Sequence, residues 1–595
     1  MRASGVRPAE NVGMAADDEL SRSVPKRTSV SSAGTTTESP WIIVALRTRR
    51  RVQRWSLILL GVLAVFITLT LLPGRTSIPP LVESDYCYQL LAVDRMCAGH
   101  GFTSLQPVAP LQPWEWQYDW GFLTQWPIGY PLLIWALRRI TGLSTLGACG
   151  WVSVAACALA LVGWFVWIKR IAPRGITGVP LAAVAAGCAG SVGLLINPTT
   201  DAILVAGLPF ILLLTTEGAS ALTLSSGVSP RRRALPSFIW AGLLAGGLFW
   251  IRYAAIFIPF AIGVFLLIEW IIRRRVGLRH VLAFGFTAAG PIVMLLAINR
   301  LFGAGPAQTQ LNLGQSVGFD LSVGMIATAW WNFTDFGFYD CHRFSHWVFA
   351  LWPIVLIAGG LYLKPTRKEL RSLLAQPGVC LSGCVVAALF VVLIGATTLF
   401  GDKFDYVGLG RYYQPIKPLY FVLFVMPLLL IPRRLVKIGV GVVLLVGCSW
   451  LVRQEWPRPY QRWLAAERER TTYGQWAQCF TPNADALYNW LKEQASPELV
   501  VISNFHEYIA LETQLPTLPI PPDVPTLDRW LSRIAQARNI TSPRVLFVLD
   551  PDNKWRDYWI PEPAKVIRVF DLEGRIITHA RGSAQVYQYQ GPVTP

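Results

Sequence analysis

Long apolar runs separated by short basic loops are the feature that most limits what this chain can fold into. The first run, residues 55–72, reads WSLILLGVLAVFITLTLL and is close to the ~20 apolar residues that a helix needs to cross a bilayer. Similar runs follow at about 145–168, 178–196, 201–217, 237–253, 254–272, 280–298, 346–363, 378–400, 415–432 and 437–452. The pattern predicts a polytopic α-helical membrane protein with roughly eleven transmembrane helices.

The composition excludes the other common classes of protein. Hydrophobic residues make up 53% of the chain and charged residues only 15%, whereas a water-exposed surface needs roughly 25% charged residues. The apolar content and 12% aromatic residues are the reverse of the composition of disordered chains. Ten cysteines in 595 residues are too few for a scaffold built on disulfides.

The basic residues indicate how the chain is oriented. The net charge of +18 would suggest a nucleic-acid partner in a soluble protein, but here Lys and Arg cluster between the apolar runs and no nucleic-acid motif accompanies them. We therefore expect membrane lipids, and no nucleic acid, as partners. Loops on the cytoplasmic side of membrane proteins carry such clusters. By this rule five loops lie on the same side as the N-terminus: 169–174, 231–233, 273–275, 364–371 and 433–437.

This orientation divides the chain into three parts. Residues 1–54 are polar and Ser/Thr-rich, and we expect a disordered cytoplasmic tail rather than a cleaved signal peptide. Residues 55–452 form the transmembrane domain, with long outer loops at 73–144 and 299–345. An odd number of spans places 453–595 outside the cytoplasm.

The C-terminal part changes from apolar runs to a mixed pattern. Residues 483–494 and about 525–537 have helical periodicity. Strand-like runs lie at 498–503, 544–549, 565–570 and 585–589. This alternation predicts a small extracytoplasmic α/β domain.

Charged residues at the predicted outer helix ends are the candidates for chemistry, because charges there need a cavity or a ligand. Asp85 and Asp201 each stand at a predicted helix start, where either could simply be a helix cap. Arg252 separates two apolar runs and would either snorkel or bind a phosphate. A basic group before the tenth span consists of Lys403, Arg411 and Lys417.

The first outer loop contains two further features. The helix that starts near Asp85 should stop at Gly99-His100-Gly101. Residues 126–142 are typical of an amphipathic helix lying at the membrane interface, which would account for the basic pair Arg138 and Arg139 in an outer loop.

Metal binding has weak support in the sequence. Asp340, His342 and His346 have a spacing compatible with a divalent metal, but two histidines at i and i+4 indicate a site only weakly. We therefore assign no cofactor and keep a divalent metal as an alternative. Cys87 and Cys97, ten residues apart on one helix, are a poor disulfide pair.

The order of these motifs resembles the polytopic GT-C glycosyltransferases, the superfamily of protein mannosyltransferases and aminoarabinose transferases that includes bacterial members of families 39 and 83. Their first outer loop runs Asp-Glu-x-x-Tyr, a helix, Gly-x-Gly and then Pro-Pro-x-Tyr-Pro. This chain has Asp85-Tyr86-Cys87-Tyr88, the Gly99 turn and Trp126-Pro127-Ile128-Gly129-Tyr130-Pro131. NPTTD at 197–201, WIRYAA around Arg252 and GRYYQPIKP from residue 410 resemble their later motifs. Tyr86 replaces the second acid that many relatives have.

The resemblance implies an inverting transfer of a sugar from a polyprenyl-phosphate donor on the outer face of a bacterial inner membrane. The acceptor would be a lipid, a glycan or a protein. By this resemblance Asp85 is the general base, and Asp201 orients the acceptor, assists Asp85 or supports a metal. Arg252, Lys403 and Arg411 hold the lipid phosphate. Residues of the first outer loop would shape the acceptor site: Tyr88, His100, Trp126 and Tyr130.

Two other hypotheses about the function are also consistent with the residues alone. A transporter or flippase of a lipid-linked saccharide would perform no covalent chemistry, and it would be expected to show internal repeats with interrupted helices near the midplane. A scaffold whose outer domain binds a partner is the other alternative.

Overall fold

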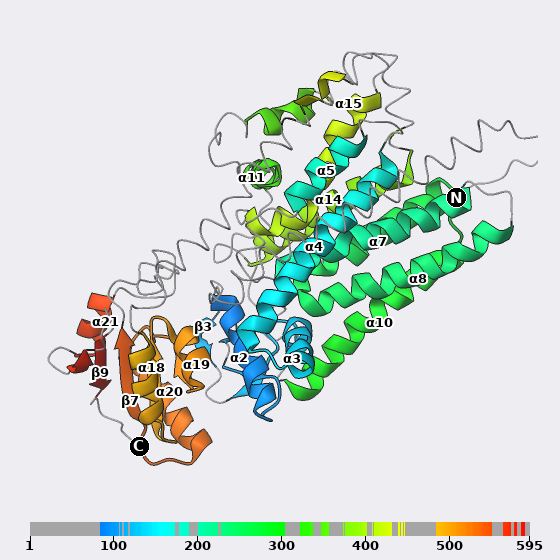
Figure 1. Ribbon diagram of the computed structural model, residues 1–595. Coiled ribbons are helices and arrows are strands. Elements are labelled where there is room, and N and C mark those ends of the chain that lie inside the picture. The colour runs from blue at the N-terminus through cyan, green and yellow to red at the C-terminus, as the bar shows by residue number, and fades with distance from the viewer. Residues whose placement is uncertain are drawn as a thin grey trace, which may run out of the picture. The chain divides into compact units, whose positions relative to one another are not determined.

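The chain is shown as a computed structural model in Figure 1. The structure describes residues 84–105, 107–109, 112–116, 120–172, 178–189, 200–223, 228–303, 322–336, 347–355, 373, 375–400, 407, 410–430, 438–440, 442–443, 446, 484–549, 563–572, 576–579 and 585–589. The predicted first helix at 55–72 lies outside these residues.

Within the described residues, six helices are long and apolar enough to cross a membrane. They are α4 (Thr145–Ile171), α7 (Thr200–Thr223), α8 (Val228–Ile251), α9 (Phe257–Leu267) with the short turns η1 (Tyr253–Ile256) and η2 (Ile268–Ile272), α10 (Leu278–Phe302) and α14 (Pro377–Phe400). Shorter elements are α5 (Gly178–Ala189), α11 (Val323–Thr334), η5 (Gly410–Ile416), η6 (Phe421–Val425) and α15 (Met426–Leu430). The predicted fold class, a polytopic helical membrane protein, is confirmed, and the total of eleven helices stays a prediction.

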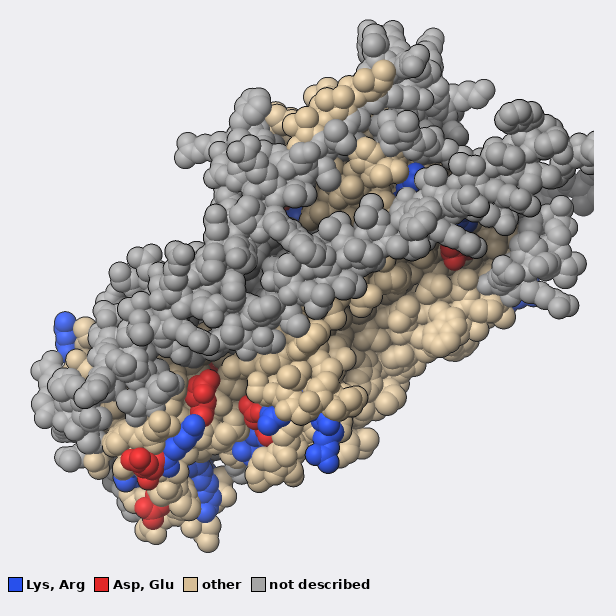
Figure 2. Space-filling model, viewed as in Figure 1, with Lys and Arg blue, Asp and Glu red and all other residues tan. Residues whose placement is uncertain are grey.

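The six helices differ in how much of their surface other helices cover. In the apolar window of α7, 67% of the residues are buried, against only 17% in α10. The exposed side chains of α10 are large and apolar, for example Phe286, Val293 and Leu301. Figure 2 shows a broad surface without charge over α8 and α10, with charged side chains gathered toward α3 and the C-terminal helices. The helix α7 is therefore central, and α10 presents the kind of surface that lipid covers.

The segment predicted as the first outer loop contains two helices, α2 and α3, with short strands between them. The helix α2 (Ser84–Cys97) ends as predicted at a turn in which Gly99 and Gly101 have φ of 86° and 73°. Two antiparallel pairs follow, β1 (Thr103–Ser104) with β4 (Gly121–Phe122) and β2 (Pro107–Ala109) with β3 (Gln112–Trp116).

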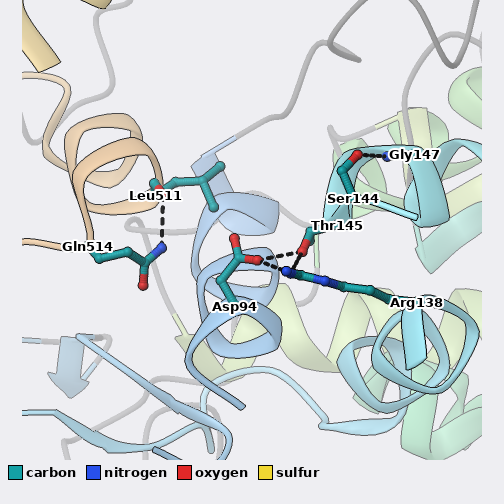
Figure 3. Close-up of polar contacts among 7 residues, drawn as sticks. All are labelled: Asp94, Arg138, Ser144, Thr145, Gly147, Leu511 and Gln514. Atoms are coloured by element: carbon teal, nitrogen blue, oxygen red, sulfur yellow. Dashed lines mark hydrogen bonds and ion pairs between the residues drawn. The ribbon is translucent and has the colours of Figure 1, made fainter. Parts of the chain in front are cut away.

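The predicted amphipathic segment at 126–142 contains the helix α3 (Gly129–Thr141). A Cβ on Gly129 would stand 2.3 Å from the carbonyl oxygen of Trp250, so glycine lets the start of α3 lie directly against the end of α8. At the other end of α3, Arg138 forms an ion pair with Asp94 of α2 and also contacts Thr145, the first residue of α4 (Figure 3). These contacts hold α2, α3 and α4 together.

The C-terminal residues form a five-stranded mixed sheet in the order β6-β5-β7-β9-β8. Its strands are β5 (Leu499–Ser503), β6 (Thr517–Leu518), β7 (Arg544–Leu549), β8 (Ile576–His579) and β9 (Gln585–Tyr589). The helices are α18 (Ala484–Glu493), α19 (His506–Thr513), α20 (Val524–Arg538) and α21 (Pro563–Val569). The strand β5 is parallel to β6 and β7, whereas β9 is antiparallel to β7 and β8.

The mixture of helices and strands in this part was predicted correctly, but the prediction of one element was wrong. Residues 565–570, predicted as a strand, belong mainly to α21. Val566 and Phe570, four residues apart, are buried on one side of this segment, while Arg568 between them is exposed. A strand would have placed all three side chains on the same face, so the helix keeps the arginine out of the apolar core.

The sheet buries apolar side chains on both faces, and the clusters on both faces include residues of α2. Leu499 and Val501 of β5 share a cluster with Leu90 and Val93 of α2. The alternate residues Val500 and Ile502 belong to a second cluster, which includes Tyr88 of α2. The helix α19 packs against α2, as Figure 1 shows for the orange and blue ribbons.

Candidate active site

A buried ion pair joins the start of α7 to the end of α8. Nη1 of Arg252 lies 2.5 Å from Oδ1 of Asp201, and the two side chains are only 14% and 5% exposed. The same nitrogen donates to Thr200 Oγ1 at 3.3 Å. Asp201 lies in the first turn of α7, where a helix also favours a negative charge. Because Asp201 also pairs with Arg252, the residue after α8, the role of Asp201 extends beyond that of a helix cap.

Arg252 owes its position to a sharp corner between two helices that cross the membrane. Its backbone is extended (φ −156°, ψ 129°) between α8 and η1. The corner is fixed on both sides, because Arg252 N donates to Leu248 O at 3.1 Å and Ala255 N donates to Arg252 O at 2.9 Å. The arginine is thus held at a helix end by regular backbone bonds rather than by a long loop.

Two further segments approach the same arginine. The guanidinium of Arg252 stands 4.7 Å from the ring centre of Tyr412 on η5, and Arg411 stands 5.5 Å from the same ring. The side chain of Tyr412 is also a hydrogen-bond partner of Arg252, and the hydroxyl of Tyr86 on α2 is near enough to act on its charge. Two cations within about 6 Å of the centre of one aromatic ring form a positively charged site that includes Tyr412.

The structure therefore brings together three of the four places that stood apart in the sequence. Asp201 pairs with Arg252, and Arg252 and Arg411 both lie near Tyr412. Asp85 is the second residue of α2, directly before Tyr86, but its side chain is outside the described residues. Lys403 is also outside them. Lys417, the third member of the basic group, is buried and donates to the carbonyl oxygen of Asp335.

The four residues predicted to shape the acceptor site fall into three separate environments. Tyr88 and Trp126 stack face to face, with ring centres 5.0 Å apart. Tyr130 is fully buried, with its hydroxyl 3.0 Å from Cys149 Sγ and its ring 6.2 Å from that of Tyr86. His100 is exposed in the turn that ends α2. Only the first pair forms an aromatic surface in common.

Some residues near the site gave no clear signal in the sequence. Tyr86 follows Asp85 and Tyr412 follows Arg411 in the sequence, so both tyrosines stood next to candidate residues. Their proximity to Arg252 could not be predicted from the sequence. The buried pair His506 and Glu507 belongs to no motif that we recognise, although His506 lies 2.6 Å from the Tyr88 hydroxyl.

The described residues contain no group of three or more His, Cys, Asp or Glu side chains that would hold a metal. The weak metal motif of Asp340, His342 and His346 lies outside the described residues, so that alternative stays untested. Cys87 and Cys97 form no disulfide with each other in the structure.

Comparison with solved structures identifies the fold. The crystal structure of ArnT from Cupriavidus metallidurans bound to undecaprenyl phosphate is similar with a TM-score of 0.51, over 90% of this chain and 98% of that chain, at 13% identity. Its apo state gives the same TM-score and identity over 91% of this chain and 100% of that chain. No family model and no curated protein matches the sequence. The chain therefore shares its fold with these solved structures.

Proposed function

We propose that this chain of GT-C fold is a membrane glycosyltransferase that moves a sugar from a polyprenyl-phosphate donor to the hydroxyl of a lipid, glycan or protein acceptor. The observation that carries the proposal is the convergence of Asp201, Arg252 and Arg411 around Tyr412, at the end of α8 that meets the first outer segment. Undecaprenyl phosphate bound to ArnT supports a donor of this class.

The reaction would be a single displacement with inversion. The acceptor oxygen attacks the anomeric carbon, the bond from that carbon to the phosphate oxygen breaks, and polyprenyl phosphate leaves with the electron pair. Asp85, in the first turn of α2, would take the acceptor proton as general base. Tyr86, the next residue, is near Arg252, so this turn lies near the proposed phosphate site.

The arginines would stabilise the negative charge that the leaving phosphate gains. An arginine side chain has five N–H donors in a fixed fork. The contacts of Arg252 with Asp201 and Thr200 both use its Nη1. Asp201 would orient the guanidinium before the donor arrives, and such preorganised donors are usually the largest electrostatic contribution to a reaction of this kind. Arg411 and Lys403 would add charge from the segment around η5.

We further propose that the site faces the outer side of a bacterial inner membrane, with the N-terminus in the cytoplasm and the C-terminal α/β domain outside. Arg273, Arg274 and Arg275 follow α9 and η2, one membrane crossing away from Arg252. Accessibility tags at residue 20 and at the C-terminus should therefore label on opposite sides of the membrane. Labelling of both tags on the same side would contradict this arrangement.

The main test is transfer by the purified full-length protein with a panel of polyprenyl-phosphate sugars and the variant Asp85→Asn. Asparagine caps a helix about as well as aspartate but cannot accept a proton, so we expect a folded protein whose kcat falls by about 10²–10⁴-fold. Asp94→Asn is the matched control, because Asp94 is a carboxylate of the same helix with a structural partner, Arg138. It should keep near-normal turnover.

Two results would contradict the proposal in different ways. Normal turnover in Asp85→Asn would remove Asp85 from catalysis and leave the general base unassigned. Tight binding of a polyprenyl-phosphate sugar by the wild-type protein without transfer to any acceptor would favour a flippase of lipid-linked saccharides instead.

A further inference from the structure

The C-terminal α/β domain contacts α2 through a buried polar cluster that the proposed reaction does not use. His506 Nε2 lies 2.6 Å from the hydroxyl of Tyr88, and His506 Nδ1 lies 2.9 Å from Oε2 of Glu507. All three side chains are at least nine-tenths buried. Burial alone would raise the pKa of Glu507, but the adjacent His506 lowers that pKa below its ordinary value, so the carboxylate is charged.

Tyr88 is held from two sides. Its ring stacks on Trp126, with an angle of 14° between the ring planes, while its hydroxyl meets His506 from the other domain. Trp126 itself belongs to the first outer segment, just before α3. The contact thus joins three parts of the chain at one tyrosine: α2, the segment before α3, and α19 of the C-terminal domain.

The apolar contacts around this cluster bring α19 and α2 together but do not set their relative rotation by themselves. Phe505 and Ile509 share a buried cluster with Leu90 and Val93 of α2. Apolar contact is non-directional and depends mainly on the area removed from water. A hydrogen bond requires a defined distance and angle. The hydrogen bond between Tyr88 and His506 therefore adds a directional restraint on the rotation of α2.

The rotation of α2 matters because of the residues at its start. Asp85 stands three residues before Tyr88 on the same helix, so its backbone moves with that of Tyr88. Tyr86 lies between them in sequence and interacts electrostatically with Arg252. A helix that turned or slid by one ångström would carry Asp85 and Tyr86 with it.

We propose that His506, oriented by Glu507, is a positioning residue that holds α2 through Tyr88 and thereby sets the place of Asp85 relative to the phosphate site. This inference rests on the proposed glycosyltransferase function. It assigns the C-terminal domain a part in the reaction: the domain completes the support of the catalytic helix from outside the transmembrane bundle.

The experiment compares His506→Ala with His506→Gln in the full-length protein. The alanine removes the partner of Tyr88, whereas the amide of glutamine reaches the position of Nε2 and keeps a hydrogen bond to the hydroxyl. In His506→Ala we expect kcat to fall on the order of 10- to 100-fold, with little change in the KM for the donor, because a small misplacement of a reacting group has such an effect. His506→Gln should recover most of the loss.

A second readout does not depend on turnover. Amide hydrogen exchange of the α2 segment should be faster in His506→Ala than in the wild-type protein, and close to the wild-type rate in His506→Gln. Asp523→Ala serves as the control, since Asp523 caps α20 of the same domain by accepting from Thr526 N at 2.8 Å. It should leave both kcat and the exchange of α2 unchanged.

The outcomes separate this inference from the proposed function. If amide hydrogen exchange of α2 is unchanged in His506→Ala, the inference that His506 holds α2 is overturned, whatever the measured turnover. Faster exchange with normal kcat would overturn the positioning role, and so would a glutamine variant that restores exchange but not kcat. A wild-type protein without turnover on any donor would overturn the proposed function and the positioning role with it, while exchange would still decide whether the two domains are fastened at Tyr88.

Discussion

Two carboxylate–arginine pairs in this protein involve similar groups in different surroundings. Asp94 and Arg138 join α2 to α3, and their side chains are 28% and 31% exposed. Thr145 donates to the same carboxylate oxygen at 2.5 Å, so three helices meet at one set of polar contacts (Figure 3). Asp201 and Arg252 join α7 to α8 and are far more buried.

The difference lies in what surrounds each arginine. Arg138 lies near the end of an amphipathic helix with the exposed Arg139 beside it, and its contacts account for a structural role. Arg252 contacts Thr200 and Tyr412, and a second arginine, Arg411, lies 5.5 Å from the centre of the same tyrosine ring. A buried ion pair is weak evidence for stability, because removing two charges from water offsets much of their attraction. We infer that the first pair fastens helices and the second serves the proposed reaction.

Removal of Arg252 should have the largest effect. Arg252→Met leaves Asp201 as a buried charge without its arginine, and breaking such a pair typically destabilises a protein by about 3–5 kcal/mol. We expect a large fall in the temperature of thermal unfolding, together with loss of sugar transfer. The double variant Asp201→Asn with Arg252→Met should recover much of the stability but none of the turnover. Recovery of turnover in the double variant would show that the pair is structural.

Arg411→Ala should have an intermediate effect, seen in donor use rather than in folding. A hydrogen bond to a charged group contributes about 1.5–3 kcal/mol, which corresponds to roughly a 10- to 150-fold rise in the donor KM. The unfolding temperature should change little, because Arg411 is half-buried and belongs to a short turn rather than to a long helix. An unchanged donor KM would exclude Arg411 from the phosphate site.

Arg138→Met should have the smallest effect. Partly exposed ion pairs are typically worth about 0.2–1 kcal/mol and are weakened by salt. We expect a small loss of stability that shrinks as the salt concentration rises, with normal kcat and donor KM. A loss of turnover comparable to that of Arg252→Met would mean that the two pairs do not differ in the way we infer.

Much of the fold could be predicted from local patterns. Apolar length predicted the spans, two glycines predicted the end of α2, and a Ser144 cap that accepts from Gly147 N at 3.1 Å marks the start of α4. The C-terminal strands β5, β7 and β9 fell where alternation of strands and helices placed them. Residues 565–570 were wrongly predicted as a strand because they include β-branched residues. In the structure Val566 and Phe570, four residues apart, are buried, which fits a helix.

The candidate site was only partly predictable. Asp201, Arg252 and Arg411 could be singled out because charge is expensive at the ends of membrane helices. Which carboxylate would face which arginine could not be read from the sequence, since Asp94 and Asp201 are both acids close to helix ends. His506 gave no signal at all, because its partner Tyr88 is 418 residues away in the chain.

The sequence by itself determined that the chain enters a membrane, roughly where its long apolar helices lie, and which residue types stand near their ends. These properties follow from neighbours along the chain, through apolar length, capping and turn preference. Only the tertiary structure decided that Asp201 meets Arg252 beside Tyr412 and that His506 reaches Tyr88. Such contacts depend on how separate helices pack and on which polar groups find partners once water is excluded, and that selection is made by the folded protein as a whole.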